Sequence, residues 1–389
     1  RACLAVHLSI DAAGRKRSHR FARALMRSAA RLTYEEVQAI RDRQLEPPSA
    51  VPPRTIAALY GAFAALGQAR AARGALELEL REDRVVLDAE ERPVRVVPAP
   101  RLDSHRLIEE FMILANVAAA EELEARHQPC MYRVHDTPAP EKMAALQDFL
   151  SNSGVPGLAL AKGQRVKPDL FNRLLRRAAD TPVAPLINEL VLRCQAQAAY
   201  SPSNIGHFGL ALRRYAHFTS PIRRYADLLV HRALVAGANA AGRDFGDGGL
   251  PPDTSDEQMA AIAEHISATE RRAAAAERAA IERYRATLLT DAIGGTFAGQ
   301  ISGVADFGVF VTLMETGATG LVPISNLPAD YYDRRESPPR LVGRRFGRVF
   351  QLGGSVTVCL LEVDAIGGRL LFRIEEETPA RGVRRSQRS

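Results

Sequence analysis

Apolar residues alternate with polar ones along the first part of the chain. Residues 2–10 and 17–26 alternate on either side of the turn-forming run Asp11-Ala12-Ala13-Gly14, and this pattern predicts a β-hairpin. Shorter alternating runs predict three more strands, at residues 76–80, 85–87 and 94–97.

Between and after these strands the apolar period changes to three and four, which is the period of a helix. Helices are predicted at residues 34–43, 55–73, 102–127, 141–150, 169–177, 184–197 and 257–289. Runs rich in glycine, serine, aspartate and proline predict loops at residues 152–163 and 237–253.

From residue 294 the pattern returns to short strands separated by glycine turns, which predicts a small closed barrel. Its last strands are expected at residues 348–364 and 369–376. The chain is therefore predicted to be an α+β protein, in which a mixed helical and β body precedes a small all-β barrel.

Charge, cysteine spacing and apolar run length indicate which partners and environment the chain suits. The 389-residue chain has a formal net charge of +7 and a pI near 9.5, which favours an acidic partner or simply aids solubility. Its four cysteines show no metal-ligand spacing, so they are interpreted as free thiols in a reducing cytoplasm. No apolar run reaches membrane-spanning length, and no membrane partner is predicted.

One stretch, HFTSPIRRY at residues 217–225, resembles the start of a helix. Thr219 or Ser220 can cap that helix, and Pro221 fits its first position, where no backbone N–H is needed. The free N–H groups and the dipole of a helix start favour an anion.

Two arginines lie in the first turn of this predicted helix. Arg223 and Arg224 would add positive charge to the helix start, so the stretch predicts a phosphate site. The alternative is an ordinary capped surface helix, in which Arg223 pairs with Asp227 one turn on.

Polar side chains interrupt the apolar faces of two predicted helices. Glu109 and Asn116 lie seven residues apart on one side of the first long helix, and charges on a buried face need partners. Glu109 either pairs with an arginine of a neighbouring helix or accepts hydrogen bonds from ribose hydroxyls. Glu270 and Glu277 interrupt the core-facing stripe of the last helix, where buried ion pairs with Arg223 or Arg224 are the simplest explanation.

Several long motifs occur in one order along the chain: MRSAARLTYEEV (26–37), LIEEFMILAN (107–116), YRVHDTP (132–138), GHFGLAL (206–212), TSPIRRY (219–225) and ERRAAAAER (270–278). In wording and order they resemble the ribonuclease R/ribonuclease II (RNB) family of exoribonucleases, over essentially the whole chain. The resemblance implies an RNB catalytic domain at residues 1–290, lacking its amino-terminal part. It also implies an S1-type OB-fold domain at residues 291–376 and a basic, disordered tail at residues 377–389.

The resemblance implies processive 3′→5′ hydrolysis of single-stranded RNA to nucleoside 5′-monophosphates. In this scheme Arg223 is the catalytic residue that holds the scissile phosphate, and Glu109 and Tyr34 fix the terminal nucleotides. Tyr34 has an alternative role as the residue that simply opens an amphipathic helix. The other RNA-binding residues implied are Asn116, His217, Ser220, Arg224 and Glu277, the last of which shapes the RNA channel.

The barrel segment FGVFV sends Phe307 and Phe310 towards the face on which S1-type domains stack bases. Core positions are the alternative for both rings, although Val309 and Val311 must fill the other face. Pro323 stands where many S1-type domains have histidine, so that contact is not expected here.

The family holds Mg²⁺ with closely spaced aspartates, and two such ions can clamp the attacking and leaving oxygens of a phosphodiester. No D-x-x-x-x-x-D-x-D-D spacing occurs in this sequence, so the ligands are expected upstream and the chain itself is predicted to hold no metal. A non-catalytic, single-stranded RNA-binding protein is the alternative function. Leu78 is a second departure, because the family often has a stacking phenylalanine in that strand.

Overall fold

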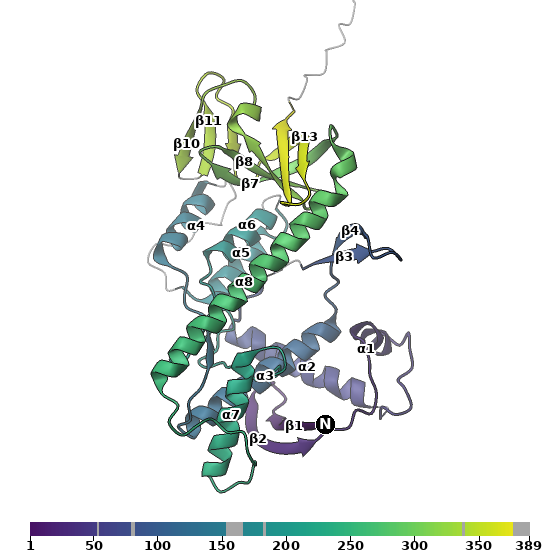
Figure 1. Cartoon of the computed structure of the whole chain (residues 1–389), viewed down its shortest axis with the longest axis vertical. Coiled ribbons are helices and arrows are strands. Elements are labelled where there is room, and N and C mark those ends of the chain that lie inside the picture. The colour runs from purple at the N-terminus through teal and green to yellow at the C-terminus, as the bar shows by residue number, and fades with distance from the viewer. Residues whose placement is uncertain (53, 79–81, 153–165, 182–183, 337–338, 376–389) are drawn as a thin grey trace, which may run out of the picture.

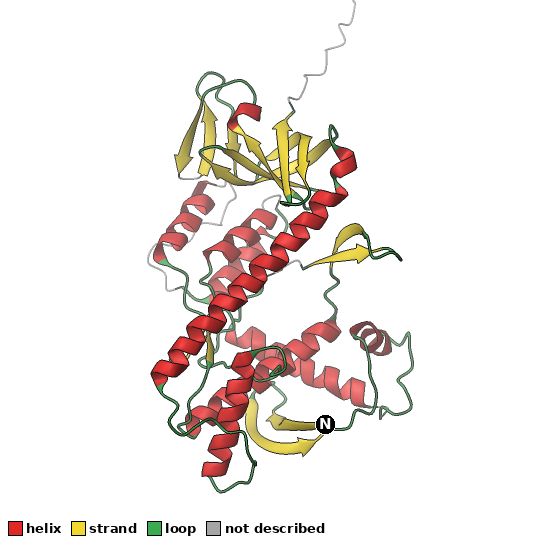
Figure 2. Ribbon diagram, viewed as in Figure 1, coloured by secondary structure: helices red, strands yellow, loops and turns green. Residues whose placement is uncertain are grey.

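The computed structural model describes residues 1–52, 54–78, 82–152, 166–181, 184–336 and 339–375 (Figure 1). A mixed helical and β body is followed by an all-β barrel, so the predicted α+β class is confirmed (Figure 2). Nearly all of the predicted loop at residues 152–163 and the whole basic tail lie outside the described residues.

The amino-terminal hairpin is confirmed as β1 (Ala2–Ile10) and β2 (Lys16–Leu25). Two helices follow, α1 (Tyr34–Arg41) and α2 (Thr55–Arg73). Thr33 begins α1 with a capping box: its hydroxyl accepts the N–H of Glu36 at 3.2 Å, and the Glu36 carboxylate accepts the N–H of Thr33.

A second hairpin, β3 (Asp83–Leu87) and β4 (Pro93–Pro98), comes next. The strand expected at residues 76–80 is not formed at residues 76–78, and its last two residues lie outside the described ranges. Leu76 and Leu78 instead pack against a hydrophobic cluster of the body. Leu78 is therefore partly buried in the body.

The body contains α3 (Asp103–Ala125), β5 (Tyr132–Val134), α4 (Pro140–Asn152), α5 (Pro168–Ala178), α6 (Ala184–Cys194), β6 (Ala199–Ser201) and α7 (Tyr225–Ala240). The main core joins buried alanines of α3 to Leu229 and Val230 of α7. Gly237 and Ala238 belong to the buried side of α7, so the loop predicted from residue 237 begins only after Ala240.

The longest helix, α8 (Asp256–Leu288), runs diagonally from the body to the barrel (Figure 1). Met259 and Ala263 pack in the body core, and Ala286 packs in the barrel core. Its middle lies between the two cores. Glu270 and Glu277 are consequently exposed, and the prediction that they face a core is wrong.

The barrel closes in the strand order β13-β14-β9-β8-β7. These strands are β7 (Thr296–Ala305), β8 (Gly308–Leu313), β9 (Thr319–Pro323), β13 (Ser355–Asp364) and β14 (Arg369–Ile374). Val309, Val311 and Phe372 fill its interior. Alternation of inward apolar and outward polar residues made these strands predictable.

A three-stranded sheet is inserted between β9 and β13. It consists of β10 (Tyr332–Glu336), β11 (Pro339–Gly343) and β12 (Val349–Gln351). The first two strands were not predicted, because arginines and prolines hide their alternation. The strand expected at residues 348–364 is divided into β12 and β13 by the turn at Gly353 and Gly354.

Candidate RNA-binding surface

The segment between β6 and α7, residues 202–224, is hydrogen-bonded to β5 and α3 of the body. The N–H of Arg133 in β5 donates to the carbonyl of Tyr215 at 2.8 Å. Asn116 of α3 is only 1% exposed: its Nδ2 donates to the Tyr215 hydroxyl at 2.9 Å, and its Oδ1 accepts the N–H of Phe218 at 2.8 Å. Asn116 thus supports the segment from inside and does not reach the surface.

His217 belongs to the same supporting layer. Its Nδ1 lies 2.9 Å from the hydroxyl of Tyr200, whose ring is covered by the guanidinium of Arg133. Burial, and then the charges of Arg224 and Arg133, lower the pKa of His217 from 6.5 to about 2. The imidazole is therefore neutral at pH 7 and contributes hydrogen bonding without positive charge.

The turn before α7 differs from the predicted capped helix. α7 begins at Tyr225, and no side chain caps it, so the helix start at Pro221 with a cap from Thr219 or Ser220 is wrong. The fully buried carboxylate of Asp227 reaches back instead and accepts the N–H of Ser220 at 2.7 Å. Asp227, a residue inside α7, therefore accepts the backbone hydrogen bond of this turn, a role that was expected of the Thr219 or Ser220 hydroxyl.

Arg224, not Arg223, is the ion-pair partner of Asp227. Its Nε donates to one carboxylate oxygen at 2.8 Å and its Nη2 to the other at 2.9 Å. This geometry arises because Arg224 has extended backbone at the residue before the helix, three positions ahead of Asp227. The alternative, in which Arg223 pairs with Asp227, is accordingly wrong.

Arg223 projects from this turn beside Ile222, which is fully exposed. Within the described ranges, its guanidinium has no hydrogen-bond or ion-pair partner. The two neighbouring arginines therefore have different tasks. Arg224 holds the turn through Asp227, and Arg223 offers an open, planar fork of donors that suits a phosphate.

Glu109 and Asn116 do not share a buried side. The Glu109 side chain is 49% exposed and accepts a hydrogen bond from Arg101 at 3.1 Å. The buried glutamate is its neighbour Glu110, which pairs with Arg70 of α2 at 2.8 Å. Sequence reasoning missed Glu110, although Arg70 on the preceding helix was an available signal. α1 and α2 pair with Asp103 and Glu110 in the first half of α3, and the buried alanines of its second half pack with α7, so the buried side changes along the helix.

Tyr34 is the first residue of α1 and is 42% exposed. Its ring stacks on the imidazole of His105 in α3, with centroids 4.1 Å apart and planes inclined by 22°. One face of the ring is therefore occupied within the protein. The remaining exposed part is what a terminal nucleotide could contact.

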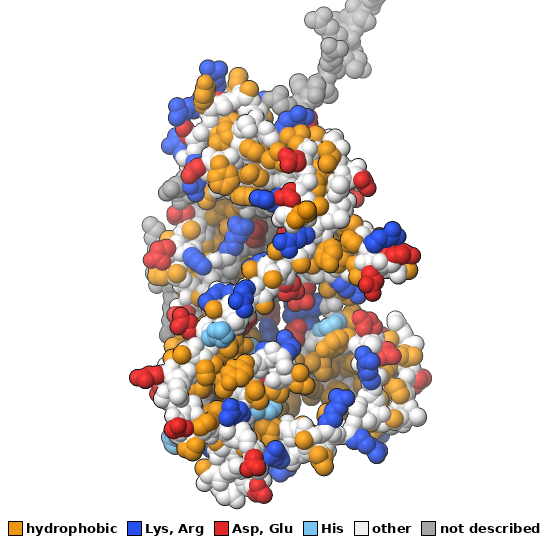
Figure 3. Space-filling model, viewed as in Figure 1, with side chains coloured by type: hydrophobic (Ala, Val, Ile, Leu, Met, Phe, Trp, Pro, Cys, Tyr) orange, Lys and Arg blue, Asp and Glu red, His pale blue; other side chains and the backbone are white. Residues whose placement is uncertain are grey.

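The exposed middle of α8 carries the two glutamates. Arg133 binds Glu270 with two hydrogen bonds, at 2.8 and 2.6 Å. Glu277 has no partner among the residues that the structure describes, so the predicted ion pairs with Arg223 or Arg224 are wrong. Beside α8 the molecular surface is hollowed, and charged and histidine side chains of both the body and the helix line the hollow (Figure 3).

The barrel presents its two phenylalanines outward. Phe307 is 58% exposed and Phe310 36% exposed, with ring centroids 6.1 Å apart and nearly perpendicular planes. The alternative of core positions is wrong for both rings, because Val309 and Val311 fill the interior.

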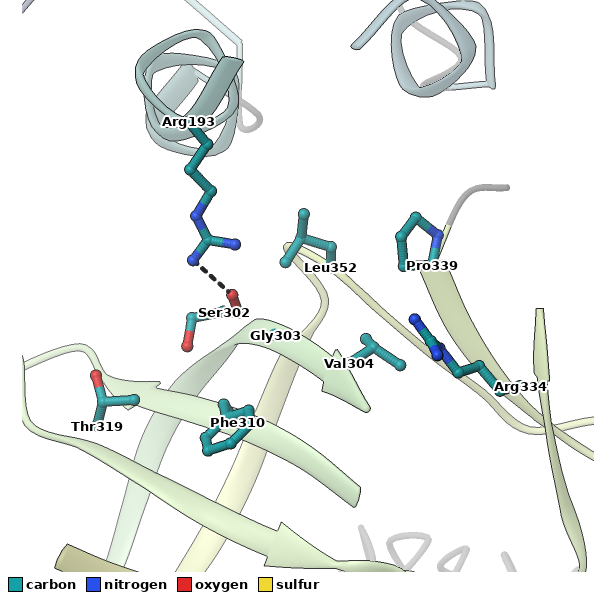
Figure 4. Close-up of a pocket in the computed structure, with 9 residues that line it drawn as sticks. All are labelled: Arg193, Ser302, Gly303, Val304, Phe310, Thr319, Arg334, Pro339 and Leu352. Carbon is teal, nitrogen blue, oxygen red and sulfur yellow. Dashed lines mark hydrogen bonds between the residues drawn. The ribbon is translucent and has the colours of Figure 1, made fainter. Parts of the chain in front are cut away.

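A pocket of about 400 Å³ opens beside Phe310 (Figure 4). Arg193 of α6 reaches across to donate to the carbonyl of Ser302 at 3.2 Å, and Arg334 of β10 approaches from the other side. Both arginines come from elements outside the barrel strands. Sequence reasoning missed them, since no local pattern shows that they line the same pocket as Phe310.

Three findings concern the chain as far as it is described. No three histidine, cysteine, aspartate or glutamate side chains come together there as a possible metal site. None of the helices in the described ranges is both long and apolar enough to cross a membrane. Cys3, Cys130, Cys194 and Cys359 are free thiols, as predicted.

The fold and this surface define a nuclease-like body joined to an RNA-binding barrel. The chain belongs to the RNB domain family: residues 1–239 match the RNB domain, and residues 290–374 match the S1 RNA binding domain. Both assignments confirm the resemblance found in the sequence.

Relatives of known name are called ribonuclease R. The protein of Vibrio parahaemolyticus is 37% identical over 381 residues, which are 97% of this chain and 45% of the relative. That of Escherichia coli K12 is 36% identical over 396 residues, covering 100% of this chain and 48% of the relative. The chain spans about half the length of these relatives. The solved structure of Mycoplasma genitalium RNase R in complex with ribose methylated single-stranded RNA has a TM-score of 0.85 at 26% identity, covering 96% of this chain and 58% of that one.

Proposed function

We propose that this chain supplies the RNA channel, the phosphate arginine and the S1 barrel of a ribonuclease R type 3′→5′ exoribonuclease. The complete protein would degrade single-stranded RNA processively to nucleoside 5′-monophosphates in the cytoplasm. In this proposal residues 1–290 form the nuclease part and residues 291–376 the S1 part. The observation that carries it is that Arg223 is exposed and has no side-chain partner among the described residues, on a turn that Arg224 and Asp227 hold in place.

Each exposed residue then has a definite role. Arg223 binds the scissile phosphate through two parallel N–H donors. The open part of Tyr34 contacts a terminal base, and the exposed carboxylate of Glu109 accepts hydrogen bonds from ribose hydroxyls. Glu277 borders the channel, and Phe307 and Phe310 stack on bases further along the strand. Asn116, His217, Ser220 and Arg224 act beneath these contacts, by shaping the turn.

Mg²⁺ is the proposed cofactor, but the described residues do not form a site for it. Its carboxylate ligands would have to come from outside these residues. When bound, the metal would supply an activated water and neutralise charge on the phosphodiester. The work assigned to this chain is to bind, orient and hold the RNA.

The chain as given is expected to bind single-stranded RNA without cleaving it, because it offers RNA contacts and no metal cluster in its described part. End-labelled RNA incubated with the chain and Mg²⁺ should show a shifted complex and no shorter products. A ladder of products at enzyme-like rates would contradict this expectation. Joining an aspartate-bearing segment of a relative to the chain tests the rival function: a chain that stays inactive is a non-catalytic RNA-binding protein.

Phe307→Ala and Phe310→Ala are each expected to weaken RNA binding, since stacking on an aromatic ring contributes about 1–3 kcal/mol per base. Affinity should fall by about five- to 150-fold, with the melting temperature of the barrel unchanged because both rings are exposed. RNA titration and thermal melting of each variant measure the two effects. Ile366→Ala is a matched control, as Ile366 is an exposed apolar residue on the β13–β14 turn of the same barrel. A variant that loses its melting transition would show that its ring is needed for folding.

A further inference from the structure

The turn between β11 and β12 concentrates arginines beside exposed rings. Residues 330–351 contain six arginines against three acidic residues. Tyr331 is 67% exposed and Phe346 68% exposed, although both are large aromatic side chains. Together with Arg344, Arg345 and Arg348, these two residues form a group that we name the basic tip. Its composition combines the two features that recognise single-stranded nucleic acid, positive charge and open ring faces.

The basic tip has a fixed backbone. The Asp330 carboxylate accepts three backbone N–H groups: those of Tyr331 and Arg345 at 2.7 and 2.9 Å, and that of Phe346 at 3.0 Å. Burial opposes ionisation of Asp330, but these hydrogen bonds outweigh it and lower the pKa. Gly343 permits the close approach, because a Cβ there would lie 2.2 Å from the Asp330 Oδ2. A preformed turn binds with less loss of conformational freedom than a mobile one.

One positive charge of the tip is held over a ring and not in an ion pair. The Arg345 guanidinium lies 5.5 Å from the centroid of Tyr331, and no carboxylate pairs with it within the described ranges. Arg344, in contrast, is paired with Asp333 at 2.6 Å. An arginine stacked on tyrosine presents a planar, charged surface on which a further base can stack while the donors reach a phosphate.

The basic tip is also connected through β10 to the barrel face that carries Phe307 and Phe310. Arg334 of β10 lies 3.2 Å from Asp306, which precedes Phe307, and it lines the same pocket as Phe310. Tyr331 lies three residues before Arg334, about 10 Å along an extended chain. Two or three nucleotides of single-stranded RNA can span such a distance, so one strand could reach both places.

We propose that the basic tip is a second binding site for single-stranded RNA, engaging nucleotides beyond those that stack on Phe307 and Phe310. The inference rests on the proposed function, in which the barrel binds RNA. RNA is favoured over an acidic protein partner because Arg345 and the rings together match a base and its phosphate. An acidic peptide would use the charge but leave both exposed rings without a role.

The test compares two double variants of the full chain. Arg345→Gln with Phe346→Ser changes the tip. Arg369→Gln with Ile366→Ser makes the same kind of change at the start of β14 and on the turn before it, where both side chains are highly exposed. Affinity for oligouridylates of about 5 and about 20 nucleotides is measured over a range of salt concentrations. The tip variant should bind the long oligonucleotide about tenfold more weakly, and its salt slope should be smaller by about 0.7 for each phosphate that is no longer bound. Its affinity for the short one, and both affinities of the control variant, should stay unchanged.

The other outcomes overturn the inference in distinguishable ways. Unchanged affinity of the tip variant for the long oligonucleotide would leave the tip as a surface for a protein partner. Equal losses for both lengths would show that the tip is not a separate site. Failure of the parent chain to bind either oligonucleotide would overturn the proposed function itself. If the tip variant melts at a lower temperature than the parent chain, Arg345→Lys replaces it. This substitution keeps the positive charge but removes the planar stacking surface. It should lower the affinity for the long oligonucleotide alone, and by less than the double substitution.

Discussion

Arg223→Lys, in a chain joined to an aspartate-bearing segment of a relative, is expected to lower the rate of RNA cleavage by about a hundredfold or more, as when one oxyanion donor is lost. The guanidinium can bind a phosphate through two parallel donors, and a lysine ammonium cannot copy that geometry. The structure leaves Arg223 exposed and without a partner within the described residues, so the substitution breaks no internal hydrogen bond or ion pair there. RNA affinity should change far less, because other backbone phosphates remain bound along the channel.

Single-turnover cleavage and equilibrium RNA affinity, measured on the same variant, separate these effects. Arg213→Lys is the matched control, since Arg213 is another exposed arginine on the same segment. The control should keep the parent rate. A near-normal rate for Arg223→Lys would remove Arg223 from the catalytic residues, and equal losses of rate and affinity would make it a docking residue only.

Arg224→Leu is expected to lower the free energy of unfolding of the body by about 3–5 kcal/mol. The Asp227 carboxylate is fully buried, and its remaining hydrogen bond would be the one from the N–H of Ser220. A buried charge without its partner is strongly unfavourable, whereas replacing both charges by apolar groups is much better tolerated. Urea denaturation of Arg224→Leu, Asp227→Leu and the double variant measures the coupling between the two residues.

The double variant should therefore lose less free energy of unfolding than the two single variants lose when their losses are added. A loss near 1 kcal/mol for Arg224→Leu, as for an exposed ion pair, would show that water or another group reaches Asp227. The same variants also release the turn that carries Arg223. In the aspartate-bearing chain they should lower cleavage even at temperatures where the body remains folded.

Much of the architecture could be predicted from local periodicity. α2 was predicted with its observed bounds, and α8 was predicted to within one residue at each end. Both helices carry apolar residues at helical spacing, and α8 begins with the capping residue Ser255. The barrel strands were predictable for the same reason, because each must alternate between an apolar interior and a polar surface.

The candidate site could be located from sequence motifs, but its internal geometry could not be derived from them. Glu109 and Glu110 are neighbours on one helix, and only the packing of α2 decides that Glu110 is the buried one. Likewise, Arg193 and Arg334 approach the barrel face from separate elements. Local periodicity reports which positions are apolar, and it does not report which partner covers them.

The sequence by itself determined the α+β class, the RNB and S1 assignments and the stretch that carries Arg223. Those features depend on residues close together in the chain, or on motifs that keep one order. Only the tertiary structure decided that α7 begins at Tyr225 and that Arg224 holds Asp227 while Arg223 stays open. Desolvation is the physical reason: a buried carboxylate must be satisfied by whichever donors the fold brings to it, and that choice outweighs the local preference for a capped helix start.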